Sequence, residues 1–313
     1  MSSPVSQKPV AVAVAVGPGE REVERVIDLA ASLAAYEGGP GWFVMVDDSP
    51  AQRDLDRVVA LPAGWTAVSL PHPRHDRATT FKVGKGIISA VLAALKWIQA
   101  TTDAAYVLKL DTDSLVINPF SEKLAAIFQS SPTLGMVGAC HMTPNGTPRD
   151  WRGHAKAVRR YFEPPAFDWK HPIASLKARK AFNAPPAAAA YVLAKKNPAF
   201  DCGEHCMGGG YAVSRTLIDR LAAARLLDDP MIWTGIDLPE DVTVGMHVRA
   251  VNMTFADNVA PGEVFGVRYR GLPFLPDELV AKGYSVIHAV KNDERVDEAT
   301  MRDYFAKRRA NLS

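Results

Sequence analysis

Short apolar runs alternate with helix-like segments through the first half of the chain, and this alternation constrains the fold more than any other feature. Residues 9–16 and 42–48 are apolar runs of strand length. Between them, the segment 20–39 places its Val, Ile, Leu and Ala side chains on one helical face. A second helical pattern begins at Ile87 and leads into another apolar run, 106–111. Strand, helix and strand in this order predict parallel βαβ units and therefore an α/β fold.

The later part of the chain continues with separate strands and helices rather than with a repeat. A glycine turn at 208–210 precedes a short strand, and Ser214 is a typical N-cap for the helix that follows. Pro239 suits the first turn of another helix. Further expected elements are a short helix opened by Ser121, a strand at 135–140, a strand at 284–288 and a charged helix from about Asp297.

The segment 143–201 has a different character. It contains eight prolines and lacks the alternation seen before it, which predicts an insertion or a set of long ordered loops. Eleven basic residues against four acidic ones give it a charge of 11 − 4 = +7. Aromatic side chains are interleaved with this charge: Trp151, Tyr161, Phe162, Phe167, Trp169, Phe182 and Tyr191. The segment is therefore a candidate platform for an acceptor, and its charge favours an anionic one; a solvated surface loop with buried anchors explains it equally well.

Size and charge limit the classes of protein. The 313 residues are 48% hydrophobic and 22% charged, a globular composition large enough to hold a core without a metal or disulfide. A formal charge of +2 gives no overall field for a nucleic acid, so nucleic-acid binding is disfavoured. The apolar stretch that ends at Gly17 is too short for a transmembrane helix and carries no cleavage-site pattern. We expect a cytoplasmic protein without a transmembrane segment; the sequence leaves the oligomeric state open.

Cysteine usage agrees with a reducing compartment, because three cysteines cannot all pair with one another. Cys202, His205 and Cys206 stand close together in the sequence DCGEHC. A structural zinc ion usually takes four ligands arranged as two pairs, so this motif is not predicted to hold one. Any metal is expected to serve chemistry instead.

The run YVLKLDTDSLV at 106–116 carries a lysine in its middle and ends on Asp111 and Asp113. Side chains at i and i+2 of an extended segment point the same way, so the two carboxylates can converge beyond the edge of the sheet. Converging carboxylates repel unless a cation or protons lie between them. Mn²⁺ or Mg²⁺, with diphosphate oxygens completing the shell, is the economical partner. An Asp-rich turn after a strand is the simpler alternative.

Other candidate residues follow later in the chain. Gly208, Gly209 and Gly210 permit a close approach of the backbone to a ligand. Glu240 has the D-x-x-E spacing of a capping box with Asp237, whereas Asp241 is not needed for such a box and is the better candidate for a general base. His288 ends an apolar run and is a candidate for a further metal ligand, although a lone histidine is more often structural.

In this order, the segments resemble the GT-A fold glycosyltransferases that use nucleotide-sugar donors. The resemblance rests on MVDDS at 45–49, LDTDS at 110–114, GGGYAVS at 208–214, PEDVTVG at 239–245 and VIH at 286–288. GGGYAVS followed by PEDVTVG looks most like the inverting β-1,3-glycosyltransferases. The resemblance spans roughly residues 9–290, whereas the 143–201 stretch matches none of these motifs. It implies a Rossmann-like, mixed and mostly parallel sheet flanked by helices, with a long proline-rich insertion.

The resemblance also implies an organisation and roles. A single catalytic domain, 1–313, would consist of a nucleotide-sugar half at 9–142, an acceptor-side insertion at 143–201 and an acceptor and catalytic half at 202–313. Asp241 would deprotonate the acceptor hydroxyl. The remaining implied roles are a metal site at Asp111, Asp113 and His288, with Asp111 also near the ribose or a metal-bound water; contacts to the nucleotide at Asp47, Asp48, Lys85 and Gly86; and contacts to the donor sugar or acceptor at Gly209, Gly210, Tyr211 and Glu240.

Two other functions fit parts of the pattern. A phosphatase of the haloacid-dehalogenase type also carries D-x-D after a strand, but normally near its N-terminus and after fewer strands than here. A protein that binds a nucleotide sugar without turning it over is the non-enzymatic alternative, and the retained Asp241 argues against it. The nucleoside of the donor, its sugar and the acceptor are not indicated by the sequence.

Overall fold

The computed structural model describes residues 9–75, 86–163, 169–170, 172, 185–233 and 235–312. The strands are β1 (Val10–Val16), β2 (Gly41–Asp47), β3 (Trp65–Pro71), β4 (Tyr106–Asp111), β5 (Leu115–Val116), β6 (Leu134–Gly138), β7 (Gly210–Ser214), β8 (Thr254–Asp257), β9 (Phe265–Gly266) and β10 (Val286–Ile287). The helices are α1 (Glu20–Tyr36), η1 (Leu55–Arg57), α2 (Ile87–Thr101), α3 (Ser121–Ser130), α4 (Arg152–Phe162), α6 (Pro185–Lys195), α7 (Arg215–Ala223), α8 (Glu240–Ala250), α9 (Pro276–Ala281), η4 (Val290–Asn292) and α10 (Glu298–Ala310).

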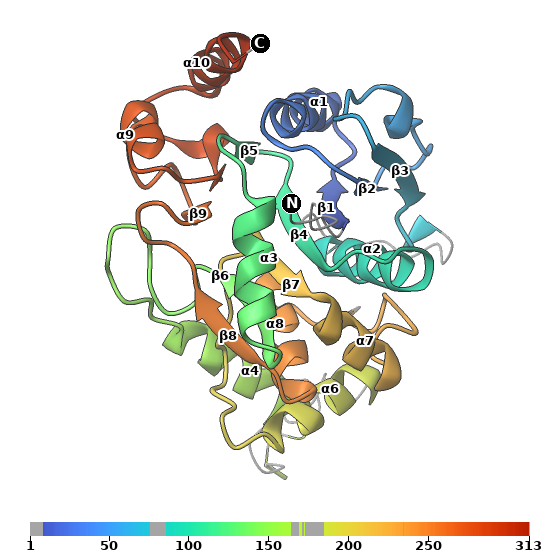
Figure 1. Ribbon diagram of the computed structural model, residues 1–313. Helices are drawn as coiled ribbons and strands as arrows, with labels where there is room; N and C mark the ends of the chain where they lie inside the picture. The colour runs from blue at the N-terminus through green and yellow to red at the C-terminus, as the bar shows by residue number, and fades with distance from the viewer. Residues whose placement is uncertain are drawn as a thin grey trace, which may run out of the picture.

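The centre of the molecule is a seven-stranded sheet in the order β3-β2-β1-β4-β7-β6-β8. The first four of these strands are parallel to one another, β7 runs antiparallel to both neighbours, and β6 pairs in parallel with β8. Helices cover both faces (Figure 1). The predicted mixed, mostly parallel sheet flanked by helices is therefore confirmed.

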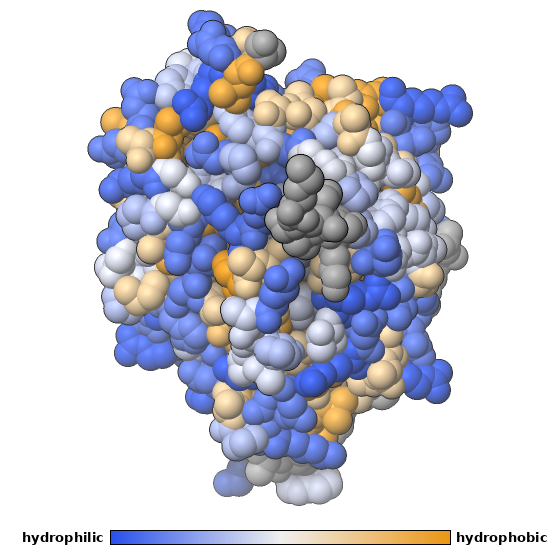
Figure 2. Space-filling view, viewed as in Figure 1, coloured by the Kyte–Doolittle hydropathy of each residue, from blue (hydrophilic) through white to orange (hydrophobic). Residues whose placement is uncertain are grey.

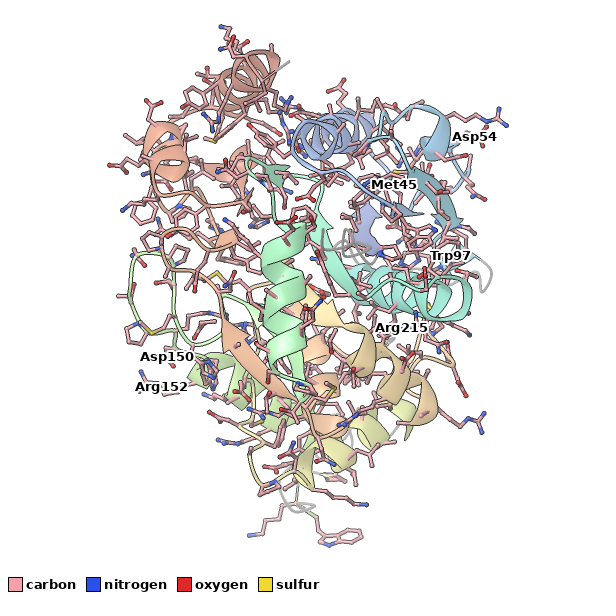
Figure 3. The ribbon with its side chains drawn as sticks, viewed as in Figure 1. Met45, Asp54, Trp97, Asp150, Arg152 and Arg215 are labelled. Atoms are coloured by element: carbon pink, nitrogen blue, oxygen red, sulfur yellow. The ribbon has the colours of Figure 1, made fainter. Side chains whose placement is uncertain are left out.

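The sequence of β1 explains how the two faces differ. Its valines at 10, 12, 14 and 16 belong to the apolar core that includes α1 and α3, whereas Ala11 and Ala13 face the core that includes α2, α6, α7 and α8. Successive side chains of a strand point to opposite faces, and the small alanines leave room for the larger side chains of α2. Arg215 ties α7 to α2 by donating to the carbonyls of Thr102 and Gln99 at 2.6 and 3.0 Å (Figure 3).

The antiparallel strand β7 determines which loops meet at the carboxyl edge of β4. Leu110 near the end of β4 pairs with Gly210 at the start of β7, and Gly138 at the end of β6 pairs with Tyr211. The turn before β7 and the turn after β4 therefore lie at the same edge of the sheet. That edge is where ligands bind in open α/β sheets.

A small second sheet, β5-β10-β9, lies beside this edge. Its core partners include α9 and α10, and α10 is fixed to α1 by ion pairs of Arg25 with Glu298 at 2.6 Å and of Arg302 with Asp28 at 2.6 Å. Ile287 pairs with Leu115 in antiparallel register. Because Leu115 is two residues after Asp113 and Ile287 is one before His288, this pairing brings the late histidine to the acidic turn.

Several elements differ from the sequence predictions. The strand expected at 284–288 is only Val286–Ile287, and β3 and β8 were not foreseen. Pro239 is the N-cap of α8, and Glu240 rather than Pro239 opens the helix, so the predicted capping box of Asp237 with Glu240 is wrong. The cap at Ser214 is confirmed, since its Oγ accepts from the N–H of Leu217 at 3.1 Å.

The basic segment 143–201 includes helices α4 and α6 among its described residues, so it is not made only of loops. Helix α6 packs chiefly against α8. Its Ala187, Ala190 and Ala194 are fully buried in the same core as Val244 of α8. On the face drawn in Figure 2, hydrophobic and hydrophilic residues are interspersed. Within the part of the chain that the structure describes, no helix is long and apolar enough to cross a membrane.

Candidate functional site

The two aspartates after β4 and the histidine after β10 form one cluster. One ligand atom each from Asp111, Asp113 and His288 lie within 4.8 Å of one another. The Nε2 atom of His288 is 3.3 Å from Asp111 Oδ2 and 3.4 Å from Asp113 Oδ1. The structure thus brings together the three residues that the sequence suggested for a metal site.

The orientation of His288 suits a ligand of a metal ion. Its Nδ1 lies 2.9 Å from the carbonyl oxygen of Arg268, so this nitrogen donates to the backbone and Nε2 faces the two carboxylates. A metal-binding histidine usually donates its other ring N–H to such a carbonyl or carboxylate. The ring packs against Gly209, where a Cβ atom would come within 2.0 Å of Nδ1. Glycine is therefore required at this position for the imidazole to reach the cluster.

Asp113 gives the clearest sign that a cation belongs here. Its side chain is only 1% exposed, yet neither carboxylate oxygen makes a hydrogen bond of ordinary geometry within the described chain. The nearest cations are His288 and the Nζ of Lys291, 3.5 Å from Oδ2. A buried carboxylate without hydrogen bonds is costly unless it coordinates a cation or is paired. The chemistry of the three side chains fits a hard divalent ion such as Mn²⁺ or Mg²⁺.

The pKa values of the cluster keep both carboxylates ionised. Burial raises the pKa of Asp111, but Lys109 and His288 together outweigh burial and hold this pKa well below its usual value. Burial also raises the pKa of Asp113, and the nearby His288 and Lys291 together lower it by more than burial raises it. Burial lowers the pKa of His288, whereas the two aspartates beside its Nε2 raise it to about 9. Without a metal ion, a proton on His288 therefore supplies the positive charge between the aspartates.

Lys109, the lysine in the middle of the apolar strand, connects the cluster to helix α8. Its side chain is 2% exposed, and its Nζ lies 2.6 Å from Asp111 Oδ1 and 3.5 Å from Glu240 Oε2 while also donating to the carbonyl of Gly208. Glu240 in turn accepts a hydrogen bond from the hydroxyl of Tyr211. Burial raises the pKa of Glu240 to about 7. The sequence shows this lysine inside the apolar run, but no function was predicted for it.

Gly210, Tyr211 and Glu240 are placed differently from Gly209. Gly210 and Tyr211 lie inside the sheet in β7, and Tyr211 is fully buried with its hydroxyl on Glu240. Tyr211 and Glu240 lie against Lys109, and Gly210 pairs with Leu110. Their contact with a donor sugar or an acceptor stays a prediction from the resemblance.

Asp241 lies on the other side of the glycine turn. Its Oδ2 accepts from the backbone N–H of Gly208 at 3.0 Å, and its side chain is 19% exposed. Gly208 contacts Asp241, and Gly209 contacts His288, so two consecutive glycines separate the candidate base from the acidic cluster. The same Oδ2 is 3.6 Å from Nε2 of His205.

His205 cannot donate to Asp241 in this arrangement. Its Nε2 accepts from Arg149 Nη2 at 2.8 Å, because a guanidinium nitrogen is always a donor. Its Nδ1 therefore carries the proton and donates to the carbonyl of Gly203 at 2.7 Å. Burial lowers the pKa of His205, which agrees with a neutral ring. Asp241 thus remains a free acceptor on its exposed side.

The acids at the end of β2 have unequal surroundings. Asp47 is fully buried, and both of its carboxylate oxygens are bonded to Arg53. The backbone N–H of Arg53 donates to Oδ2 at 2.9 Å, and its Nη2 lies 2.5 Å from Oδ1. Asp48 is partly exposed and lies 2.5 Å from Arg74 Nε, with the imidazoles of His72 and His75 at 3.8 and 3.7 Å. Asp48 is thus the more accessible of the two.

The other nucleotide candidates lie nearby or outside the described residues. The carbonyl of Gly86 is 2.8 Å from Nε2 of His72, which places the start of α2 beside Asp48. Lys85 lies outside the described residues. The basic cluster of His72, Arg74 and His75 was missed from the sequence, although the crowding of PHPRH at 71–75 signalled it.

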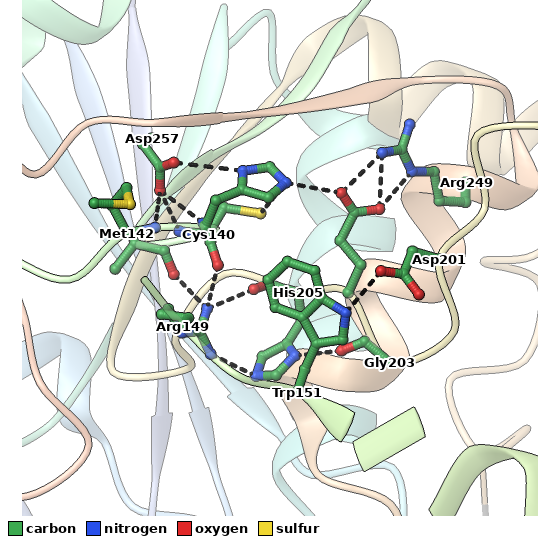
Figure 4. A network of polar contacts seen from close by, with 12 residues as sticks. Cys140, Met142, Arg149, Trp151, Asp201, Gly203, His205, Arg249 and Asp257 are labelled. Carbon is green, nitrogen blue, oxygen red and sulfur yellow. Dashed lines mark hydrogen bonds and ion pairs between the residues drawn. The ribbon is translucent and has the colours of Figure 1, made fainter. Parts of the chain in front are cut away.

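Cys202, His205 and Cys206 do not form a ligand set. Cys202 points its thiol at the carbonyl of Ala155 at 3.6 Å, and both ring nitrogens of His205 are occupied as described above. A different group of metal-binding side chains, Cys140 with His141 and Glu204, lies close together at the end of β6 (Figure 4).

Comparison of the sequence with protein-family models and with curated proteins gives no match. The fold, however, is similar to a solved structure described as the apo structure of the bifunctional glycosyltransferase WbbM, with a TM-score of 0.50 and 13% sequence identity. The similarity covers 99% of this chain and 51% of that chain, so the chain spans about half the length of the neighbour. At this identity the likeness concerns the fold alone, and it agrees with the Rossmann-like GT-A architecture expected from the motifs.

Proposed function

We propose that the protein is a metal-dependent glycosyltransferase that moves a sugar from a nucleoside-diphosphate donor to an acceptor hydroxyl with inversion. The observation that carries the proposal is the cluster of Asp111, Asp113 and His288, in which a buried carboxylate lacks hydrogen bonds and Asp241 lies across a two-glycine turn. The fold similarity to a glycosyltransferase structure supports the same reading. The narrower likeness to inverting β-1,3-glycosyltransferases rests on the motifs alone.

Each residue of the cluster has a defined task in this proposal. Asp111, Asp113 and His288 would hold Mn²⁺ or Mg²⁺, which when bound stabilises negative charge on a departing diphosphate. Lys109 occupies Asp111 Oδ1 and leaves Oδ2 turned toward His288. Gly209 lets the imidazole reach the carboxylates. These contacts fix the ligands before the donor arrives, which reduces the cost of ordering them during the reaction.

Asp241 is the proposed general base. It accepts the proton of the acceptor hydroxyl as the oxygen attacks the anomeric carbon from the side opposite the diphosphate. The N–H groups of Gly208 and Val242 bind its two oxygens at 3.0 and 2.9 Å and hold the carboxylate in place. Because His205 already accepts from Arg149, it does not compete for the acceptor proton.

The donor and the acceptor are proposed to approach from opposite sides of the turn at Gly208 and Gly209. Asp48 with Arg74, beside the carbonyl of Gly86, offers polar groups to a nucleoside. On the other side, α4 carries Arg152, Lys156, Arg159 and Arg160 and no acidic residue, a charge that favours an anionic acceptor.

The test is a panel of nucleoside diphosphates and their sugars, with and without Mn²⁺, read by thermal shift and by product release. A ligand that binds only the folded state raises the apparent melting temperature. We expect one nucleotide family to stabilise the protein only with metal, and nucleoside diphosphate to be released in the presence of an acceptor. Release of inorganic phosphate would indicate a phosphatase instead, and stabilisation without any product would indicate a binding protein.

The variant Asp241→Asn tests the base separately. It should bind the donor with unchanged affinity and lose at least about 100-fold in transfer rate, because general-base catalysis contributes 10²- to 10⁴-fold. Near-full transfer by this variant, with wild-type donor binding, would rule out Asp241 as the base.

A further inference from the structure

We propose that Cys140, His141 and Glu204 form a binding site for one zinc ion, separate from the aspartate cluster of the proposed transferase. Cys140 and His141 lie two and three residues after the end of β6, and Glu204 lies in the turn region before β7. Cys140 and its neighbours Arg249 and Asp257 are labelled in Figure 4. The site thus joins the two ends of the segment that leaves the sheet after β6 and returns at β7.

The separations of the ligand atoms suit zinc. His141 Nε2 is 3.0 Å from Glu204 Oε1 and 3.9 Å from Cys140 Sγ, and the three ligand atoms lie within 4.8 Å of one another. Thiolate, imidazole and carboxylate bind zinc at about 2.0–2.3 Å in a tetrahedral arrangement, so ligand atoms are roughly 3.3–3.8 Å apart. The observed separations of 3.0 and 3.9 Å lie just below and just above this range. Small shifts of the three side chains would therefore bring their ligand atoms to tetrahedral positions around one ion.

Both ligands of the β6 loop are held by a second layer of contacts. Asp257 Oδ1 accepts from the backbone N–H groups of Cys140 and His141, each at 2.8 Å, and its Oδ2 lies 3.4 Å from His141 Nδ1. A carboxylate on the second ring nitrogen of a histidine is the usual support of a zinc ligand. Nδ1 thus faces Asp257, and Nε2 faces Glu204 on the side proposed for the metal.

Glu204 and Cys140 have supports of their own. Arg249 donates to both oxygens of Glu204, from Nε to Oε2 at 2.8 Å and from Nη2 to Oε1 at 2.9 Å. The backbone N–H of Cys140 is held by Asp257, and its side chain is fully buried beside His141. Every proposed ligand is therefore oriented before an ion binds.

The exposure of the ligands leaves one side open. Cys140 and Glu204 are buried, whereas the side chain of His141 is 43% exposed. Three protein ligands with a solvent-facing fourth position describe an open zinc site rather than a closed structural one. The bound ion would pin Glu204, four residues before Gly208, which holds the proposed base Asp241.

The test measures zinc binding by the full chain in the Asp113→Asn background, so that the aspartate cluster does not take up the ion. After removal of metal with a chelator, we expect one equivalent of Zn²⁺ to bind, and Co²⁺ to give a thiolate charge-transfer band with the strong visible absorption of a tetrahedral site. His141→Gln and Cys140→Ser should each weaken zinc binding more than about 100-fold. Cys202→Ser is the matched control and should bind as tightly as its parent.

Two results would overturn the proposal: absence of the cobalt–thiolate band in the parent protein, or zinc affinity in His141→Gln equal to that of the parent. His141 is partly exposed, so this variant decides the matter even if Cys140→Ser does not fold. Neither result bears on sugar transfer, which is tested independently through Asp113, His288 and Asp241.

Discussion

Replacing Gly209 by alanine tests the acidic cluster without altering any of its charges. The new Cβ would lie 2.0 Å from Nδ1 of His288 and 2.1 Å from its Cγ, whereas ordinary contacts are 3.4–4 Å. The imidazole must therefore move by at least 3.4 − 2.0 = 1.4 Å. Gly209 does not have a positive φ, so the alanine backbone itself is not strained and the whole effect is on His288.

A displacement of this size removes His288 as a ligand. Metal–ligand distances tolerate changes of about 0.2 Å, far less than 1.4 Å. We expect Mn²⁺ affinity to fall by at least about tenfold, since disturbing even the supports of a metal ligand costs 10- to 100-fold. The bond of Nδ1 to the carbonyl of Arg268 is also lost, at a cost of about 1 kcal/mol in the free energy of unfolding.

The assay is a calorimetric titration with Mn²⁺ beside a urea unfolding curve for each variant. Gly210→Ala is the matched control, because its Cβ would meet Val267 at 3.3 Å and Leu110 at 3.5 Å and touches no atom of the cluster. The control should keep wild-type affinity. If Gly209→Ala is folded and binds Mn²⁺ as tightly as Gly210→Ala, the assignment of His288 as a ligand is refuted.

Three further changes test the surroundings of the site. Lys109→Met should lower the free energy of unfolding by about 3–5 kcal/mol in urea, because it removes the buried cation that pairs with Glu240, 8% exposed, and with the partly exposed Asp111. Ser214→Ala should cost about 1 kcal/mol in the same assay, through loss of the cap on α7. Burial lowers the pKa of His247 to about 4. Between pH 6.5 and 4 the unfolded chain therefore binds a proton at this histidine, whereas the folded chain does not. Stability should therefore fall between pH 6.5 and 4 by up to about 1.4 kcal/mol per pH unit, and His247→Leu should flatten this slope.

Each of these changes has its own control. Lys291→Met removes a lysine that is 34% exposed and should cost far less than Lys109→Met; equal losses would contradict the buried role of Lys109. Ser214→Thr keeps the capping oxygen and should retain most of the stability. An unchanged acid slope in His247→Leu would mean that other groups govern the acid response.

Much of the fold could be predicted from local patterns. The βαβ order, the strands predicted at 9–16, 42–48 and 106–111 and the cap at Ser214 follow from apolar periodicity and capping chemistry, and the strands are found within one residue of these bounds. Strand β8 could not be predicted, because Thr254 is exposed and the other residues up to Asp257 are only partly buried. The antiparallel direction of β7 depends on contacts far apart in the sequence. The predicted capping box of Asp237 with Glu240 is wrong because the Glu240 carboxylate pairs with Lys109 and accepts from Tyr211 instead.

The candidate site shows the same division. The sequence predicted that Asp111 and Asp113 converge, and the meeting with His288 agrees with the motif order. The predicted reason was wrong, because β4 ends at Asp111 and the two aspartates converge through the turn that follows, in which the N–H of Ser114 donates to the carbonyl of Asp111 at 3.0 Å. The sequence did not reveal that Asp47 is saturated by Arg53, since that contact depends on how the loop after β2 folds back. Nor did it reveal the grouping of Cys140 with Glu204, because these residues come from opposite ends of a long excursion.

The start and finish of that excursion are adjacent. The chain departs from the sheet after Gly138 and re-enters at Gly210, and Gly138 is the direct neighbour of Tyr211 on the next strand. The spacing of both anchor points is therefore set by the pairing of β6 with β7 and not by the length of the stretch between them. That stretch is nevertheless part of the core, because α6 packs its buried alanines with α8, so an exchanged segment would keep the strands in register only if it also covered α8.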